Sequence, residues 1–449
     1  MIEPDTIYGK NKEMVMAMMW KPELETLSRE ELERRQLKLF RKQMHHVMEE
    51  SPFYRRKFAG IHPSDIKTVD DVRNVPFTTK QELLDSQQEY PIYGDFPCIR
   101  PHQATRVFQT SGTTGTPLRI SWTKKDWFET FYDQFSYFLY GYGVSPADVA
   151  FFPFMYGLFV AWWGMQATME LHGVTIVPGG GQTSENRLRS IIDWGATVVC
   201  GTPTYIIFLG ELAEKIGIDL PGSKVRIVIT AGEPGAQVPS TKQLIERLWG
   251  AKNYDDIGST EISNFGFECV AQQGTHLIES MFLPESLDLE TGKQVGQGEI
   301  GELVLTNLCC ESMPLLRYKT KDLVRFNYDA CECGRTFLRM EGGVLGRADD
   351  MFHFGGVNIY PSAIENFIRG VPEFASEYQL VVPPQGSGEK LLIKVEPATT
   401  DISEDRMHEA VSRFVKDVNY NVKITPRVEI VESGSLTRFE GKARRIIRL

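Results

Sequence analysis

The sequence lacks the features that mark exported, membrane-spanning and nucleic-acid-binding proteins. It begins Met1-Ile2-Glu3-Pro4-Asp5 and no apolar core follows, which argues against a signal peptide. The most apolar stretch, Phe151 to Met165, is shorter than the roughly 20 residues that a membrane span needs. The net charge of -10 is opposite in sign to the basic excess typical of nucleic-acid binders. We therefore expect a cytoplasmic protein that binds neither a membrane nor a nucleic acid.

Cysteine is also scarce, with seven residues in a chain of 449. An odd number in an unexported chain favours free thiols or metal ligands over a disulfide framework. The composition is that of a globular protein, with 42% hydrophobic and 24% charged residues and no internal repeat or low-complexity segment. A chain of this length is too long for one small core, so we expect at least two domains.

Short β-branched runs alternate with helical stretches through the middle of the chain. The pattern predicts strands at residues 174–177, 197–200, 225–229 and 253–257, and helices at 185–194 and 240–249. This alternation is typical of an α/β fold, in which helices cover parallel sheets. Functional loops in such sheets follow the carboxyl ends of strands, as Ala231-Gly232-Glu233 and Gly258-Ser259-Thr260-Glu261 do here.

The regions before and after this alternation have different patterns. Ser28 and Glu31 form a capping box at the start of an N-terminal helix. Glycine-punctuated strands at residues 282–326 predict a β-rich subdomain. The rest predicts an α+β tail with a helix at 361–369, strands at 378–382 and 391–395, a helix capped by Ser403 and a strand at 427–431. We expect a large domain at residues 1–348 and a small mobile domain at residues 349–449.

The stretch from Gln109 to Pro117 is the most informative in the chain. It reads Gln109-Thr110-Ser111-Gly112-Thr113-Thr114-Gly115-Thr116-Pro117, so hydroxyls and glycines interleave. Such a loop can turn its backbone N–H groups and hydroxyls toward one anion, because glycine adopts backbone angles that other residues avoid. It is not a Walker loop, since Leu118 stands where the lysine would be expected. The alternative, for the stretch taken alone, is an ordinary flexible turn.

The loop resembles the nucleotide-binding signature of the acyl-adenylate-forming superfamily, which includes acyl-CoA synthetases, luciferases and adenylation domains. Further parts of that pattern follow in order: Ala231-Gly232-Glu233-Pro234, Tyr254-Asp255-Asp256-Ile257-Gly258-Ser259-Thr260-Glu261, Arg317-Tyr318-Lys319-Thr320-Lys321-Asp322, Gly346-Arg347-Ala348-Asp349-Asp350 and Glu440-Gly441-Lys442-Ala443. Three more stretches resemble the phenylacetate–CoA ligase branch: Ser51-Pro52-Phe53-Tyr54-Arg55, Val75-Pro76-Phe77-Thr78-Thr79-Lys80 and Tyr156-Gly157-Leu158-Phe159. The resemblance spans nearly the whole chain.

The resemblance implies an ATP-dependent ligase that joins an aromatic acid, such as phenylacetate, to coenzyme A through an acyl-AMP intermediate. AMP and pyrophosphate would be released. Two anions must meet in the first step and negative charge must be stabilised as pyrophosphate leaves, so the site needs backbone amides, a cation and a metal. The implied cofactors are ATP, Mg²⁺ and coenzyme A, and a homodimer is a further possibility.

The resemblance also implies roles for single residues. Lys442 would be the catalytic lysine, Glu261 the Mg²⁺ ligand and Thr260 a contact of the α-phosphate. Asp349 would be the hinge about which the C-terminal domain rotates between two half-reactions. The implied phosphate contacts are Ser111, Gly112, Thr113, Thr114 and Gly115. Glu233 and Pro234 would pack the adenine, with Ala231 and Gly232 in the same cofactor-binding motif. Asp322 would bind the ribose hydroxyls, Arg347 the ribose or a phosphate, and Asp255 and Asp256 would be further cofactor contacts. Gly355 and Gly356 would let the pantetheine of coenzyme A pass close to the backbone.

The aromatic stretch after residue 150 would line the acyl pocket. Phe154, Tyr156, Gly157 and Phe159 correspond to the segment that lines it in arylacetate ligases, and flat aromatic walls suit a flat ring. The alternative is that the same residues are plain core.

A second constellation consists of Cys269, His276, Cys331 and Cys333. One nitrogen and three sulfurs form the closed tetrahedral set that suits structural Zn²⁺, and some relatives in the phenylacetate–CoA ligase branch carry such a site. The alternative is unliganded thiols.

Two other functions remain open at this point. An adenylate-forming enzyme could use a different acceptor, passing the acyl group to a carrier protein or AMP to a cofactor. A non-catalytic ligand sensor on the same fold is the other alternative. Glu261 and Lys442 argue against the sensor, because a binder needs neither.

Overall fold

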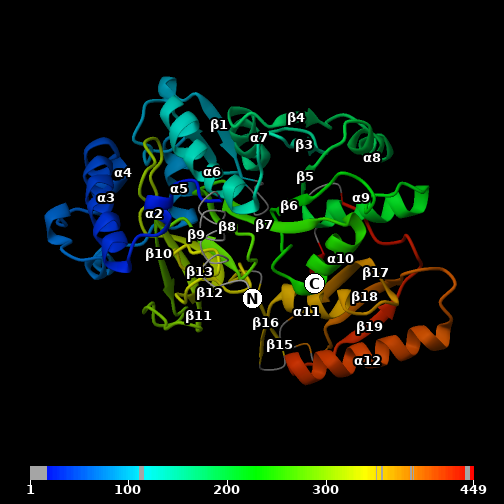
Figure 1. Ribbon diagram of the computed structural model, residues 1–449. Helices are drawn as coiled ribbons and strands as arrows, with labels where there is room; N and C mark the ends of the chain where they lie inside the picture. The colour runs from blue at the N-terminus through cyan, green and yellow to red at the C-terminus, as the bar shows by residue number, and fades with distance from the viewer. Residues whose placement is uncertain are drawn as a thin grey trace, which may run out of the picture.

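The computed structural model describes residues 18–110, 116–349, 351–354, 357–384, 387, 389–439 and 445–449. Among these residues, no helix is both long enough and apolar enough to cross a membrane. Figure 1 shows the N-terminal helices, in blue, at one side and the C-terminal elements, in orange and red, at the lower edge of the other.

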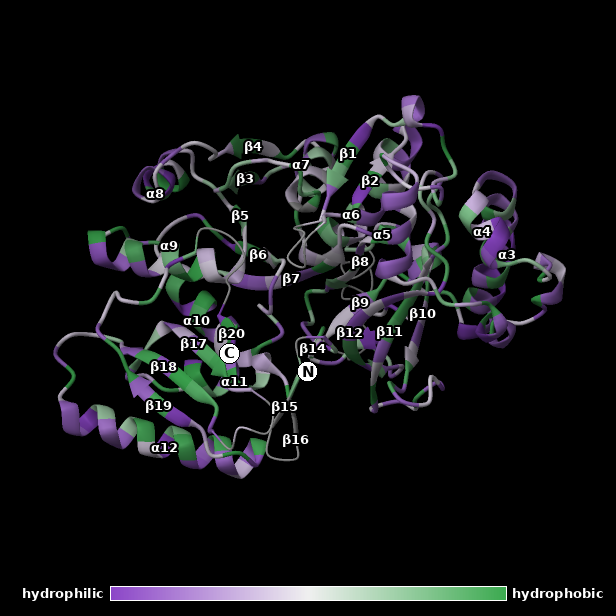
Figure 2. Cartoon of the chain, turned by 180° about the vertical axis from the view of Figure 1, so that it is seen from behind, coloured by the Kyte–Doolittle hydropathy of each residue, from purple (hydrophilic) through white to green (hydrophobic). Residues whose placement is uncertain are grey.

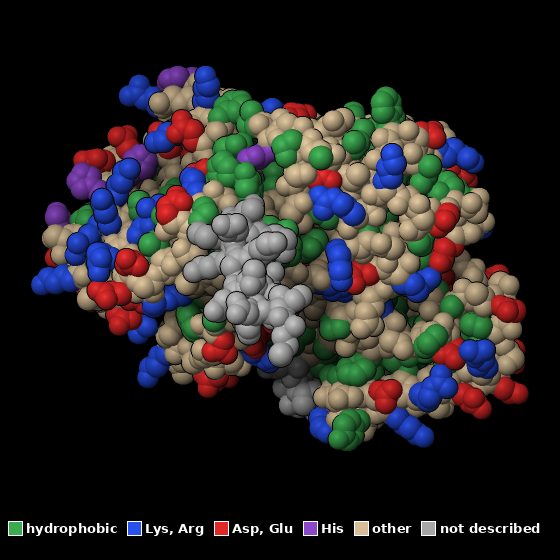
Figure 3. Space-filling view, viewed as in Figure 1, with side chains coloured by type: hydrophobic (Ala, Val, Ile, Leu, Met, Phe, Trp, Pro, Cys, Tyr) green, Lys and Arg blue, Asp and Glu red, His purple; other side chains and the backbone are tan. Residues whose placement is uncertain are grey.

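The N-terminal part of the described chain is helical. Its helices are α2 (Pro22–Glu25), α3 (Arg29–Glu50), α4 (Pro52–Lys57) and α5 (Lys80–Glu89). The predicted capping box of α3 is confirmed, because Ser28 accepts a hydrogen bond from Glu31 N and the Glu31 carboxylate accepts one from Ser28 N. Lys, Arg and His side chains are numerous on the visible surface of this helical end (Figure 3).

A mixed sheet forms the centre of the large domain. In the described part of the chain it has twelve strands, of which five, in the order β4-β3-β5-β6-β7, run parallel. The four predicted strands are confirmed, and each predicted end lies within about two residues of the observed end. The parallel strands are β3 (Val149–Phe152), β4 (Thr175–Pro178), β5 (Val198–Gly201), β6 (Ile227–Ala231) and β7 (Lys252–Ser259).

Helices cover both faces of the parallel strands. Ile227 and Ile229 of β6 belong to the core with α6 and α7, whereas Val228 belongs to the core with α8, α9 and α10. Burial on both faces explains why these strands are continuous β-branched runs. The helices are α6 (Phe131–Tyr142), which continues a π-helical turn at Asp126–Thr130, α7 (Ala161–Leu171), α8 (Ser184–Asp193), α9 (Pro203–Ile216) and α10 (Pro239–Trp249).

Antiparallel strands extend the same sheet beyond β7. They confirm the predicted β-rich region, and β8, β9 and β13 join it to the parallel strands by hydrogen bonds. A separate hairpin of β1 (Arg106–Gln109) and β2 (Arg119–Trp122) flanks residues 111–115. The extending strands are β8 (Ser263–Glu268), β9 (Thr275–Leu277), β10 (Phe282–Leu287), β11 (Ile300–Asn307), β12 (Tyr318–Asn327), β13 (Arg339–Met340) and β14 (Gly346–Arg347).

The C-terminal part forms a small α+β unit with its own core. A hairpin of β15 (Phe352–Phe354) and β16 (Val357–Ile359) precedes it, and its described sheet has the order β19-β18-β17-β20. The predicted helices and strands are confirmed, whereas a domain boundary at residue 349 stays a prediction. Figure 2 shows hydrophobic and hydrophilic residues mixed along β17 and β18, and an α12 that is hydrophilic over much of its length. The elements are α11 (Pro361–Arg369), β17 (Phe374–Val382), β18 (Leu392–Pro397), α12 (Glu404–Val422), β19 (Arg427–Ile430) and β20 (Ile446–Arg448).

Candidate active site

Two of the predicted motifs lie at the carboxyl ends of neighbouring parallel strands. β6 ends at Ala231, and Gly232 follows with φ 92°, a conformation that favours glycine. The Glu233 carboxylate accepts a hydrogen bond of 2.9 Å from Thr204 N in the first turn of α9, and exposed Pro234 follows it. β7 ends at Ser259, so Thr260 and Glu261 form the turn into β8. The strand-end placement predicted from the sequence is therefore confirmed.

Lys80 forms an ion pair with Glu261, the predicted magnesium ligand. Lys80 Nζ is 2.8 Å from Glu261 Oε1, and the glutamate side chain is only 8% exposed. Lys80 opens α5, and the residues before it pair with β12: Thr78 N donates to Arg317 O and Lys319 N donates to Thr78 O. Lys80 lies in one of the stretches that resemble the phenylacetate–CoA ligase branch, but no role was predicted for it. The resemblance of that stretch to the ligase branch could have drawn attention to Lys80. Its pairing with Glu261 could not be predicted, because the contact joins residues far apart in the chain.

Asp322, Arg347 and Asp349 form a second charged group beside Glu261. β12 and β14 place Asp322 opposite Arg347, whose Nη1 is 3.2 Å from Asp322 Oδ1, while Arg347 Nε is 2.9 Å from Asp349 Oδ1. Burial raises the pKa of Asp322 to about 6 in spite of Arg347. Burial alone would also raise the pKa of Asp349, but the hydrogen bonds and charge of Arg347 lower it. Buried Tyr318 is close to Glu261 and to all three residues, so the two groups adjoin.

Asp255 and Asp256 are buried inside β7. Asp255 N donates to Glu268 Oε2 on β8, and Asn264 Nδ2 donates to the Asp256 carboxylate. Burial raises the pKa of Asp256 to about 7 and that of Asp255 well above its usual range, where Glu268 and Asp256 add to the effect. These partners are protein groups of the β7–β8 hairpin, so a nucleotide contact of either residue stays a prediction.

The aromatic stretch has a packed part and an open part. The Phe154 ring centroid is 5.4 Å from those of Tyr156 and Trp162, and Tyr156 is 4.5 Å from Trp163. Phe159, by contrast, is 57% exposed. Trp163 Nε1 donates to Gly157 O, and Gln109 N donates to Leu158 O. The stretch therefore lies beside β1, the strand that leads into the predicted phosphate loop.

Several predicted residues lie outside the described part of the chain: Ser111, Gly112, Thr113, Thr114, Gly115, Gly355, Gly356 and Lys442. The chain is described again at Arg445, three residues after Lys442. The Arg445 guanidinium lies 4.9 Å from the Tyr378 ring centroid and 3.2 Å from Glu377, and it is also close to Glu233 of the large domain.

The C-terminal unit contacts the large domain through polar side chains. Ser376 Oγ donates to Glu211 Oε2 at 3.0 Å, and Ser240 Oγ donates to Asn366 Oδ1 at 3.0 Å. Burial raises the pKa of Glu211, partly offset by the Ser376 hydrogen bond. The interface therefore contains a carboxylate that water would solvate if the two parts separated.

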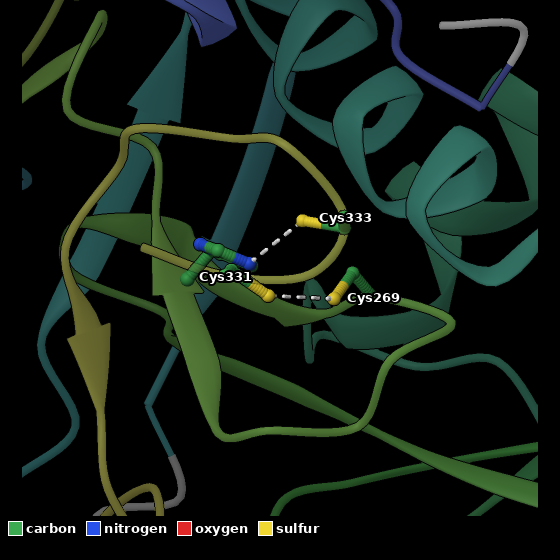
Figure 4. A group of neighbouring side chains, drawn as sticks. Cys269, Cys331 and Cys333 are labelled. Atoms are coloured by element: carbon green, nitrogen blue, oxygen red, sulfur yellow. Dashed lines mark hydrogen bonds between the residues drawn. The ribbon is translucent and has the colours of Figure 1, made fainter. Parts of the chain in front are cut away.

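The four predicted metal ligands converge at the other end of the β7–β8 hairpin. Cys269 follows β8, His276 lies on β9, and Cys331 and Cys333 lie on the loop before β13; all four are buried, with ligand atoms within 4.8 Å of one another. Cys269 Sγ is 3.7 Å from Cys331 Sγ, and His276 Nε2 is 3.4 Å from Cys333 Sγ (Figure 4). A tetrahedron with Zn–S bonds of about 2.3 Å has ligand separations of about 3.8 Å, so these residues fit Zn²⁺.

Family comparisons agree with this geometry. The AMP-binding enzyme family model matches residues 52–309, and the model of the AMP-binding enzyme C-terminal domain matches residues 356–449. A phenylacetate-coenzyme A ligase of Thermus thermophilus is 36% identical, with 96% of this chain and 100% of that protein covered. A phenylacetate-coenzyme A ligase of Escherichia coli is 33% identical, with 95% of this chain and 97% of that protein covered.

Solved structures of a 2-hydroxyisobutyryl-CoA ligase share the fold. In its postadenylation state, in complex with 2-HIB-AMP, it matches with a TM-score of 0.91 at 28% identity and covers 96% of this chain and 92% of that one. In its thioesterification state, with 2-HIB-AMP and CoA, it matches with a TM-score of only 0.72 at the same coverage. The arrangement of this chain is thus closer to the postadenylation state of that relative. The chain belongs to the AMP-binding enzymes and, within them, to the phenylacetate–coenzyme A ligase family.

Proposed function

We propose that the protein joins an aromatic carboxylic acid, phenylacetate or a related aryl acid, to coenzyme A at the expense of ATP. The observation that carries the proposal is the adjoining pair of charged groups around Glu261, at the end of β7, and Asp322, within β12. It supports the family activity because a carboxylate for Mg²⁺ and a carboxylate for a ribose lie side by side.

In the first step, the substrate carboxylate forms a bond to the α-phosphorus of ATP, and the bond to the β-phosphate breaks as pyrophosphate leaves. We assign Lys442 the role of compensating the charge of the two anions, and Thr260 that of holding the α-phosphate. Glu261 would hold Mg²⁺, which when bound supplies positive charge at the phosphates. Lys80 balances the charge of Glu261 before the nucleotide arrives.

In the second step, the sulfur of coenzyme A forms a bond to the acyl carbon, the bond from that carbon to AMP breaks, and the thiol proton goes to solvent. We assign the change between steps to rotation of the C-terminal unit about Asp349. The difference in TM-score between two states of one relative supports a change of this kind. The contacts of Ser376 with Glu211 and of Ser240 with Asn366 would then be broken and remade in each turnover.

The aromatic stretch supports an aryl substrate. The rings of Phe154, Tyr156 and Trp163 supply flat apolar walls, and exposed Phe159 has room to close over a bound ring. Burial raises the pKa of Tyr156, whose hydroxyl donates to Gln166, so it stays neutral at physiological pH.

Pyrophosphate release, measured with and without coenzyme A across a panel of acids, tests this function. An aryl acid should beat acetate and fatty acids, and coenzyme A should convert one release per site into continuous turnover. Turnover with acid and ATP but only in the presence of a carrier protein or another cofactor would favour the alternative acceptor. Binding of the acid without any pyrophosphate release would favour the ligand sensor.

We also propose that Cys269, His276, Cys331 and Cys333 hold a structural Zn²⁺. The support is a closed set of four buried ligands. His276 Nδ1 lies 3.1 Å from Phe337 O, and donation of its proton to that carbonyl leaves Nε2 free to bind a metal. Elemental analysis of purified protein should give about one zinc per chain.

A further inference from the structure

The loop that carries Cys331 and Cys333 also contacts the beginning of the described chain. We call residues 18–29 the N-terminal segment and residues 331–337 the cysteine loop. Arg335 of the cysteine loop forms an ion pair with Glu25 in which the two side chains are only 1% and 0% exposed. Arg335 Nη2 also donates to Met18 O. One arginine of the loop therefore holds both a side chain and the backbone of the segment.

Neighbouring residues strengthen this attachment. Thr336 N donates to Glu25 O at 2.8 Å, and Thr336 Oγ1 donates to Leu27 O at 2.7 Å. At the end of the segment, Arg29 pairs with Glu279, whose second oxygen accepts a 2.6 Å hydrogen bond from Leu338 N. The N-terminal segment is thus attached to residues that directly follow two of the metal ligands. It is attached separately to α6, where Trp20 Nε1 donates to Asp133 Oδ1 and Lys21 pairs with the same carboxylate.

Arg335 faces the metal ligands as well as Glu25. Its guanidinium interacts with Cys333 and lies 5.2 Å from the centroid of Phe267, whose ring is 5.7 Å from that of His276. Three thiolates around one Zn²⁺ leave a net negative charge, which a neighbouring guanidinium offsets. Because a buried charge without a partner is costly, Arg335, Glu25 and the cluster depend on one another.

We infer that Arg335 couples the metal site to the N-terminal segment. A bound metal stabilises the docking of residues 18–29, and by linkage this docking strengthens metal binding by the same factor. The inference rests on the zinc site proposed above. It adds that outer-shell residues of this chain set the metal affinity and that metal occupancy controls whether the segment is held.

Hydrogen exchange measured by mass spectrometry tests the first half of the coupling. The full-length protein is compared with zinc bound and after removal of zinc by a chelator. Exchange of residues 18–29 should become roughly tenfold faster without zinc, because their hydrogen bonds to the cysteine loop are lost. Peptides of α12, in the C-terminal unit, should not change.

Zinc affinity measured by chelator competition tests the second half. Arg335→Met should weaken zinc binding by about 10- to 100-fold, the usual effect of losing an outer-shell partner. Glu25→Gln, which leaves every metal ligand and its loop intact, should weaken it in the same direction but less. Arg369→Met is the matched control, because it breaks an equally buried ion pair with Glu365 far from the cluster.

Three outcomes contradict the inference. Zinc removal that leaves exchange of residues 18–29 unchanged would overturn the coupling while the zinc site stands. Equal zinc affinity in the wild type and in Glu25→Gln would do the same, even if Arg335→Met failed to fold. Wild-type protein that binds no added zinc would overturn the zinc site and the coupling together, whatever its ligase activity.

Discussion

The two ends of the β7–β8 hairpin carry different kinds of side-chain groups. The turn end holds Thr260 and Glu261, and the cysteine end holds Cys269, roughly 20 Å away along β8. At the cysteine end three cysteine sulfurs and one histidine nitrogen face one another in a closed, buried set. At the turn end the buried carboxylate of Glu261 faces Lys80, whose side chain is partly exposed. The four ligands of the cysteine end all precede the C-terminal unit in the chain, whereas we propose that the turn end is completed by Lys442 and by the substrates.

This difference suggests separate roles for the two ends, with the cysteine end contributing to folding stability and the turn end to turnover. A closed set of buried ligands contributes to the free energy of folding and gains nothing from motion. The ion pairs of Lys80, Arg347 and Asp349 are partly exposed, so each contributes little to stability and can rearrange easily. We therefore expect changes at the turn end to affect kinetics and changes at the cysteine end to affect folding.

Replacing the lysine assigned to the turn end should have the largest kinetic effect. Lys442→Ala should slow adenylation by about 100-fold or more, because it removes charge compensation in the transition state. Conversion of supplied acyl-AMP to thioester should be nearly unchanged. Rapid-quench measurement of both half-reactions checks this, with Lys416→Ala on the exposed face of α12 as the control. Equal loss in both half-reactions would remove the assigned role.

Asp349→Pro should separate the two half-reactions in the other direction. A rigid φ at the hinge hinders rotation of the C-terminal unit, so thioester formation should slow by about tenfold or more while acyl-AMP accumulates on the enzyme. Quantifying bound acyl-AMP before and after addition of coenzyme A measures this. Normal thioester formation in the variant would show that the unit does not turn at Asp349.

Changes at the cysteine end should affect stability instead. Replacing both Cys331 and Cys333 with serine should remove the metal and lower the melting temperature by several degrees, because the site's contribution to folding is lost. The kcat of protein that remains folded should stay near that of the wild type. Calorimetry, elemental analysis and assays at saturating substrate check this. Metal retained by the double variant would show that other residues bind it.

The pKa of Asp322 predicts a smaller, pH-dependent effect at the turn end. Above its pKa of about 6 the carboxylate is ionised and would accept hydrogen bonds from the ribose that we propose it binds; below that pKa the protonated group would do so poorly. The KM for ATP should therefore rise several-fold as the pH falls from 7 to 5. Asp322→Asn should have a high KM at every pH and lose this dependence. An unchanged pH profile in the variant would assign the dependence to another group.

The smallest effects are expected in the acyl pocket, where packed and open rings differ. Phe154→Ala should raise the KM for aryl acids more than Phe159→Ala, because Phe154 packs against other rings and Phe159 is exposed. The KM for ATP should change little in both variants. If neither variant alters aryl-acid kinetics, the aromatic stretch is core and the arylacetate assignment fails, although adenylate formation would stand.

Local sequence patterns predicted much of the fold. Runs such as residues 227–229 are buried on both faces of the sheet, and Ser28 and Ser403 cap helices with their own side chains, so neighbouring residues were enough. The pairing of β8, β9 and β13 could not be predicted, because their register depends on contacts between residues far apart in the chain.

The same limit applies to the candidate site. The strand pattern predicted Glu261 at a strand end, and the cysteine and histidine spacing predicted Cys269 with His276 beside Cys331. The contact of Lys80 with Glu261 was missed because it joins residues 181 positions apart. The exposure of Phe159 was also missed, since a short aromatic run has the same composition whether it is core or pocket wall.

The most direct test of the proposed acyl-AMP intermediate follows one oxygen of the substrate carboxylate into the products. The protein is given phenylacetate labelled with oxygen-18 in the carboxylate, together with ATP and coenzyme A, and the AMP formed is examined by mass spectrometry. Attack of the carboxylate on the α-phosphorus predicts one labelled oxygen in each AMP and the other in the thioester. Unlabelled AMP, or ADP and phosphate as products, would contradict an acyl-AMP intermediate at this site.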